Sequence, residues 1–272
     1  GSGIGTILLS IAASALIAEY QWRISYLIVG GGVWMILVLS AQLLRRDPQQ
    51  MGQEPYGGDV VKTAAVYDSD KGLCFRETIS TGRFWVLCAA FFCFGFDLYT
   101  VMVHLVAHAI EMGIPALNAA GIIAVVGGVN AAGRVGMGFI SDRIGNLRCL
   151  VISFLLMTAA LVLLTFAAEM WQLYIFGVIF GIGYGGLAAL MAPVPAELFG
   201  LRSIGTIVGA VTCSFTLGGA VGPVLAGLLS DITGGYHAAF AACAAVGVLG
   251  TIFSVLMGRA AKTDGSAAGR SL

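Results

Sequence analysis

The strongest constraint on this chain is a series of long apolar runs. About eight segments are long enough to cross a membrane, because a hydrocarbon core of about 30 Å needs about 20 apolar residues in a helix. A soluble core could not bury so many apolar helices, so the sequence predicts an all-α, multi-pass membrane protein. The runs cover roughly residues 1–18, 24–44, 84–109, 112–137, 149–167, 170–196, 203–230 and 238–257.

The composition agrees with a surface that faces lipid. Only 10% of the residues are charged, whereas soluble proteins carry about 25%. The net charge is zero, which argues against nucleic acid as a partner. The six cysteines have no zinc-like spacing, and no GxSxG or HExxH motif occurs. The sequence predicts neither an enzyme nor a site for a metal or organic cofactor.

The apolar runs fall into two groups. Residues 1–44 hold two of them and residues 84–257 hold the rest, while residues 45–83 form a charged linker and residues 258–272 a polar tail. We therefore expect two transmembrane helices, a central loop, a six-helix unit and a tail.

The positive charges predict an orientation, because Lys and Arg concentrate on the cytoplasmic side of membrane proteins. If the linker is cytoplasmic, most of the fourteen Lys and Arg lie on that side. We expect a cell-membrane protein, in a plasma or bacterial inner membrane, with its central loop and C-terminus in the cytoplasm. The cations outside the linker that then face the cytoplasm are Arg143, Arg148, Arg202, Arg259, Lys262 and Arg270.

A charged segment after the fourth run carries the most specific motif. It reads GFISDRIGNLR over residues 138–148. It resembles the signature G-x-L-[AS]-D-R-x-G-[RK]-[RK] of major facilitator superfamily carriers, found between helices 2 and 3 and again between helices 8 and 9. Placed at the second position, it makes the chain helices 5–12 of a major facilitator fold. We therefore expect an N-terminally truncated fragment of that fold.

The chemistry of each residue in this signature suggests a structural or electrostatic role. Gly138 and Gly145 permit a tight turn and the close approach of helices. Asp142 is a fixed negative charge that a helix N-terminus would attract, and Arg143 and Arg148 are its flanking cations. The resemblance implies a gating contact between Asp142 and the start of helix 5, here residues 1–5. The alternative is an ordinary turn with topogenic charges.

Other segments resemble the monocarboxylate and oxalate–formate carriers within that superfamily. Residues 20–26 (YQWRISY) are similar to their GWRxAY element, and residues 76–85 (RETISTGRFW) to their "REAL…FW" entry to helix 7. The resemblance implies a monomeric secondary transporter for a small organic anion. Oxalate–formate carriers have a lysine in helix 11, which residues 203–230 lack, so oxalate is not favoured.

Arg134 is the leading candidate for binding an anion. A charge inside a span is costly and usually lines a cavity or meets a partner, and guanidinium binds carboxylates bidentately. In the monocarboxylate carriers helix 8 bears an Asp and an Arg four residues apart. Here Asn130 stands in place of that Asp, on the same helix face as Arg134. The alternative is that Arg134 snorkels to the interface.

Two residues of the run 84–109 are candidates for binding substrate or protons. Asp97 is an acidic residue deep in this span, and it either pairs with Arg134 or is held neutral by burial. His104 is a candidate cavity or proton-relay residue. His104 and His108 have an i, i+4 spacing that could bind a metal, but no further ligand is evident.

The run 203–230 carries a glycine and proline pattern that resembles the antiporter motif G-x8-G-x3-G-P-x2-G. Gly218, Gly222 and Pro223 are its central residues. Glycines allow helices to pack closely and proline favours a kink. A gating hinge and simple tight packing are equally compatible with this pattern.

The sequence thus favours a carrier of a small organic anion, with protons as a candidate co-substrate. One alternative is a major facilitator exporter of another small molecule, to which a buried guanidinium would be of little use if the cargo were a cation. Another is a truncated membrane fragment that does not transport.

Overall fold

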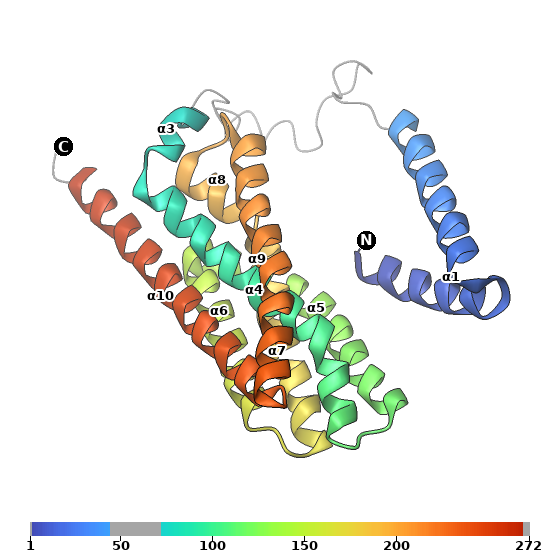
Figure 1. The fold of residues 1–272 in the computed structure, drawn as a ribbon. Helices are drawn as coiled ribbons and strands as arrows, with labels where there is room; N and C mark the ends of the chain where they lie inside the picture. The colour runs from blue at the N-terminus through green and yellow to red at the C-terminus, as the bar shows by residue number, and fades with distance from the viewer. Residues whose placement is uncertain (1, 44–71, 269–272) are drawn as a thin grey trace. The chain divides into compact units, whose positions relative to one another are not determined.

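The computed structural model describes residues 2–43 and 72–268. The chain divides into two compact units, Gly1–Asp68 and Ser69–Leu272. Most of the predicted central loop, residues 45–83, lies outside the described residues, as does the end of the tail (Figure 1).

The first unit contains α1 (Ser2–Leu43), which is two helical segments joined at a break. The break lies at Gln21, whose φ of 64° and ψ of 158° are not helical. A positive φ is uncommon for a residue other than glycine. This break separates the two predicted apolar runs, and Arg23–Gln42 is long and apolar enough to span a membrane. The run 1–18 is largely helical but is not among the segments that meet this criterion.

The second unit is a bundle of long helices with two short ones. Seven candidate membrane spans occur in the described part of the chain, six of them in this unit, which confirms an all-helical membrane fold. The helices of this unit are α3 (Phe75–Ile79), α4 (Gly82–Glu111), α5 (Ala116–Ile144), α6 (Asn146–Thr165), α7 (Met170–Leu190), α8 (Pro193–Phe199), α9 (Ile204–Thr233) and α10 (His237–Ala268).

Three predicted boundaries were wrong, and one of them is the end of α10, which continues to Ala268 beyond the predicted end at residue 257. The run 112–137 becomes α5, which continues to Ile144, so most of the signature segment is helical. The run 170–196 is divided, because α7 ends at Leu190 and α8 begins at Pro193. Proline lacks the N–H that an interior helical position donates, and it is favoured in the first turn of a new helix.

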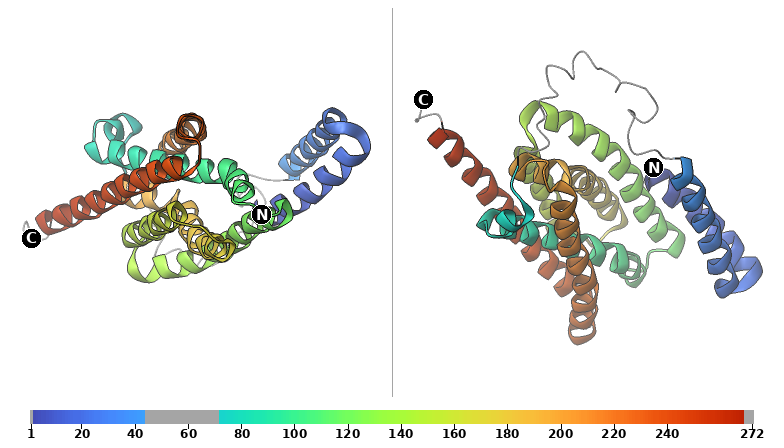
Figure 2. Two further views of the ribbon diagram at one scale, coloured as in Figure 1. Left: turned by 60° about the horizontal axis from the view of Figure 1, so that its bottom comes forward. Right: turned by 90° about the horizontal axis from the view of Figure 1, so that it is seen from above.

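The long helices of the second unit pack in a definite pattern. α4 packs mainly against α9 and α10, α5 against α7, and α6 against α7 and α10 (Figure 2). Buried aromatic side chains fill the space between them. The largest of these are Phe91, Phe94, Phe154, Phe176, Phe180 and Phe240.

Glycines bring α4 and α9 into backbone contact. A Cβ atom added to Gly218 would overlap the carbonyl oxygen of Phe92, and one at Gly222 would lie 2.5 Å from the carbonyl oxygen of Phe96. Gly95 on α4 approaches Phe215 of α9 equally closely. Small residues of this kind let transmembrane helices approach along their backbones. The described contacts of Gly218 and Gly222 are therefore tight packing.

Gly218→Ala should weaken the bundle even though alanine favours helices. The added methyl group overlaps the backbone of α4, and overpacking costs about 1–3 kcal/mol. Gly209→Ala, on the same helix, is the matched control, because a Cβ there meets nothing within 4 Å. The control should be unchanged or more stable by up to about 1 kcal/mol. Unfolding of the detergent-solubilised protein by a denaturing detergent, followed by circular dichroism, measures both. Equal stability of the two variants would contradict this packing.

Candidate functional site

Arg134 and Asn130 form the polar pair that their spacing predicts. The guanidinium Nε of Arg134 donates a hydrogen bond of 3.1 Å to Oδ1 of Asn130, one turn earlier on α5. Asn130 is buried and Arg134 is partly exposed. Within the described part of the chain, no other hydrogen bond engages the guanidinium. Its two terminal nitrogens therefore keep the geometry needed to bind a carboxylate at two points.

The backbone of α7 fixes the position of this pair. A Cβ on Gly185 would lie 2.6 Å from the carbonyl oxygen of Asn130 and 2.8 Å from the backbone nitrogen of Arg134. Gly181 and Gly133 make similarly close contacts between the same two helices. The four-residue spacing of Gly177, Gly181 and Gly185 indicates that one face of α7 packs closely against another helix. It does not indicate which helix that is.

Asp97 lies in the core of the bundle and is fully buried. Neither of its carboxylate oxygens has a hydrogen-bond partner among the described residues. It faces α10 and α6, because a Cβ on Gly247 would lie 3.3 Å from Oδ2 of Asp97 and 2.9 Å from Oγ1 of Thr158. Thr158 in turn shares a hydrogen bond of 3.1 Å with Thr251.

The structure does not join Asp97 to Arg134. The first belongs to the contact between α4, α6 and α10, and the second to the contact between α5 and α7. The sequence left a direct ion pair open, and the structure excludes one in this conformation. The sequence analysis did not predict that Thr158 and Thr251 lie near Asp97, because nothing in the sequence shows that α6 and α10 pack there.

His104 connects α4 to the proline of α9. Its Nε2 donates a hydrogen bond of 2.9 Å to the carbonyl oxygen of Pro223, since a carbonyl can only accept. Its ring lies 5.2 Å from that of Tyr236. His108 is buried, and its ring centroid lies 5.6 Å from that of His237. No group of three or more candidate metal ligands occurs among the described residues.

The signature segment surrounds a single glycine turn. Gly145 separates α5 from α6 with a φ of 91°, a conformation that favours glycine. Gly138 lies inside α5, and a Cβ there would meet no described atom within 4 Å, so the close approach expected of it is not seen. Asp142, Arg143 and Arg148 are exposed. The predicted contact of Asp142 with residues 1–5 would join the two units and stays a prediction.

These observations agree with what a family comparison shows. The sequence model of the Major Facilitator Superfamily matches residues 1–149 and 131–271. The chain belongs to the Major Facilitator Superfamily. It is therefore a multi-pass membrane protein of a transporter family and not an enzyme.

Several relatives in this superfamily are named as monocarboxylate transporters. The chain is 28% identical to monocarboxylate transporter 12 of Rattus norvegicus over 89% of its own length and 54% of the relative's. It is 27% identical to monocarboxylate transporter 11 of Mus musculus over 96% of its length and 58% of the relative's. The chain thus spans little more than half the length of the relatives it matches.

Solved major facilitator structures share the fold. The outward conformation of the transporter FucP has a TM-score of 0.57 at 16% identity, covering 89% of this chain and 57% of FucP. A peptide transporter POT, crystallised with sulfate, has a TM-score of 0.60 at 18% identity, covering 71% of this chain and 40% of that protein. At these identities the likeness concerns the fold alone.

Asp97→Asn should leave the stability of the protein nearly unchanged. Asparagine keeps the shape of the side chain, and among the described residues the carboxylate has no cationic partner to lose. We expect a change below about 1 kcal/mol, whereas breaking a buried ion pair costs about 3–5 kcal/mol. Thermal unfolding in detergent measures it, with Asp231→Asn, an exposed carboxylate on α9, as the control. A loss in the ion-pair range would show that Asp97 has a cationic partner after all.

Proposed function

We propose that this chain is part of a secondary transporter that carries a small organic anion across a cell membrane by alternating access. Its membership of the Major Facilitator Superfamily and its likeness to monocarboxylate transporters support this proposal. The central loop and C-terminus would lie in the cytoplasm, as the distribution of Lys and Arg predicts.

The proposal of an anionic substrate rests on the guanidinium of Arg134, whose two terminal nitrogens have no hydrogen-bond partner among the described residues. Its Nε is held by Asn130, so the side chain is oriented while its terminal nitrogens remain available. The rigid glycine contact between α5 and α7 limits movement of the backbone beneath it. A fixed guanidinium within a membrane span favours a compact carboxylate over a neutral or cationic cargo.

Protons are the proposed co-substrate, and Asp97 is their proposed carrier. An asparagine amide does not titrate, so the pair on α5 cannot release a proton from residue 130. A buried carboxylate without a cationic partner is stable mainly in its neutral form, and it becomes ionised only when its surroundings change. Rearrangement of α4 against α10 during transport would supply that change.

His104 and the α9 residues would couple this movement to the gate. His104 ties α4 to the carbonyl of Pro223, and Gly218 and Gly222 lie on the same contact. Pro223 cannot donate a backbone hydrogen bond, so α9 is weakest near this residue. At the other end of the bundle, Asp142 would close the gate against the start of the chain, with Gly138, Arg143, Gly145 and Arg148 around it.

Replacing Arg134 with lysine tests the anion site. Lysine keeps the positive charge but loses the two-point fork, and a hydrogen bond to a charged group contributes about 1.5–3 kcal/mol. Uptake of labelled small monocarboxylates into proteoliposomes, using the full-length protein that contains this chain, should fall about 10-fold or more. Arg76→Lys, an exposed arginine on α3, is the control and should transport normally.

The other outcomes are also informative. If Arg134→Lys and the unmodified protein take up carboxylate equally, Arg134 does not bind the substrate. If the unmodified protein accepts no carboxylate, the proposed substrate class is wrong although the family assignment stands.

Replacing Asp97 with asparagine separates proton coupling from substrate binding. The amide cannot bind and release a proton, so a pH gradient should no longer drive accumulation of substrate. Exchange of labelled for unlabelled substrate at equal pH on both sides should persist, because Arg134 is unaltered. If a pH gradient still drives accumulation in this variant, Asp97 is not the proton carrier.

A further inference from the structure

A groove opens beside the turn between α5 and α6, at one end of the second unit. Its volume is about 860 Å³. Two arginines, Arg143 and Arg148, and one glutamate, Glu197, lie on it, and its remaining walls include Val151, Ile152 and Val255. Gly145 and Gly258 border open space, because a Cβ at either position would meet nothing within 4 Å.

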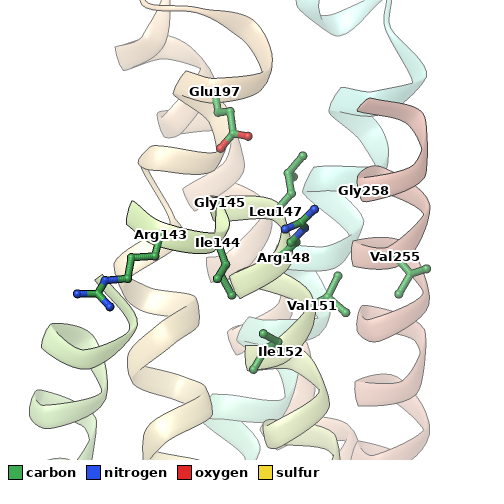
Figure 3. A pocket seen from close by; sticks show the side chains of 10 residues that line it. All are labelled: Arg143, Ile144, Gly145, Leu147, Arg148, Val151, Ile152, Glu197, Val255 and Gly258. Carbon is green, nitrogen blue, oxygen red and sulfur yellow. The ribbon is translucent and has the colours of Figure 1, made fainter. Parts of the chain in front are cut away.

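The positive charges of Arg143 and Arg148 are not neutralised by the other described residues that line the groove. Arg148 projects into the space between α6 and α10, and Arg143 lies on the opposite side of the turn (Figure 3). In the described part of the chain, neither arginine has a hydrogen bond or an ion pair. Glu197, on α8, instead accepts a hydrogen bond of 2.8 Å from the amide of Asn146. The groove therefore keeps a net positive charge.

The apolar wall of the groove continues along the bundle. Ile152 is exposed, as are Leu155 on the next turn of α6 and Ile252 of α10. Both helices are candidate membrane spans, and the groove lies at the end where α6 begins. An occupant would thus find cationic groups at the membrane surface and an apolar channel leading into the hydrocarbon region.

We propose that this groove binds a membrane phospholipid with an anionic headgroup. The phosphate would lie against Arg148, with Arg143 at the rim, and one acyl chain would follow the wall formed by Ile152 and Val255. The arginines, which have no ion pair within the described residues, favour an anion, and the apolar wall favours a lipid chain. A soluble anion would satisfy only the first of these features. This site is separate from Arg134 and does not depend on the proposed substrate.

Native mass spectrometry of the purified chain tests this proposal. The protein is incubated with equal amounts of phosphatidylglycerol and phosphatidylcholine that carry the same acyl chains. We expect preferential retention of phosphatidylglycerol. Arg148→Gln should reduce this preference about five-fold, since a basic residue near a membrane surface contributes about that factor for anionic lipid. Arg76→Gln, which does not line the groove, should leave the preference unchanged.

A second variant tests the groove itself. In Val255→Trp the larger side chain occupies the apolar part of the groove while both arginines remain. This variant should retain phosphatidylglycerol no better than phosphatidylcholine. Circular dichroism and gel filtration confirm that each variant is folded. An excess of free glycerol phosphate should not displace the lipid.

Any of several results would overturn the proposal. The first is either equal retention of both lipids by the unmodified chain or an Arg148→Gln variant with unchanged preference. The second is full phosphatidylglycerol retention by Val255→Trp, which would place the lipid elsewhere. The third is displacement by free glycerol phosphate, which would indicate a site for a soluble anion.

Discussion

Helices in a membrane gain little by burying apolar side chains against one another, because the lipid is equally apolar. Close backbone contact therefore has a larger part in holding the bundle together. Gly218 and Gly222 bring α9 onto α4, and Gly185 brings α7 onto α5. The proposed anion site at Arg134 and the bond from His104 to Pro223 lie next to these contacts.

Two polar groups, the guanidinium of Arg134 and the carboxyl of Asp97, lie in different helix contacts of this bundle. On α5, the approach of Gly185 fixes the backbone at Arg134, whose guanidinium remains available to an anion. On α4, Asp97 faces Gly247 of α10, close to Thr158 of α6, and its carboxylate has no hydrogen-bond partner among the described residues. The proposed transport of an anion with a proton would use the permanent charge of Arg134 and the titratable carboxyl of Asp97, and these lie in different helix contacts. Coupling would then travel through movement of helices, for which the bond from His104 to Pro223 is a direct connection.

The sequence predicted the general architecture well because each span must satisfy its own backbone hydrogen bonds within lipid, which makes length and hydropathy sufficient evidence of a helix. It was less accurate at helix ends. The signature segment was predicted to be a turn, yet α5 continues through Asp142 to Ile144 and only Gly145 leaves the helix. Helix ends depend on local hydrogen bonds and tertiary contacts that hydropathy does not report. For the same reason, the division of the run 170–196 at Pro193 was not predicted.

The sequence by itself determined the membrane fold, the family resemblance and the pairing of Asn130 with Arg134, because all three depend on interactions between residues close together in the chain or on composition. Only the tertiary structure decided that Asp97 faces α10 and not Arg134, that His104 bonds to Pro223, and that Arg148 borders an open groove. These features depend on how helices distant in sequence are rotated and paired. An apolar helix with little amphipathic pattern carries weak information about which of its faces meets which neighbour.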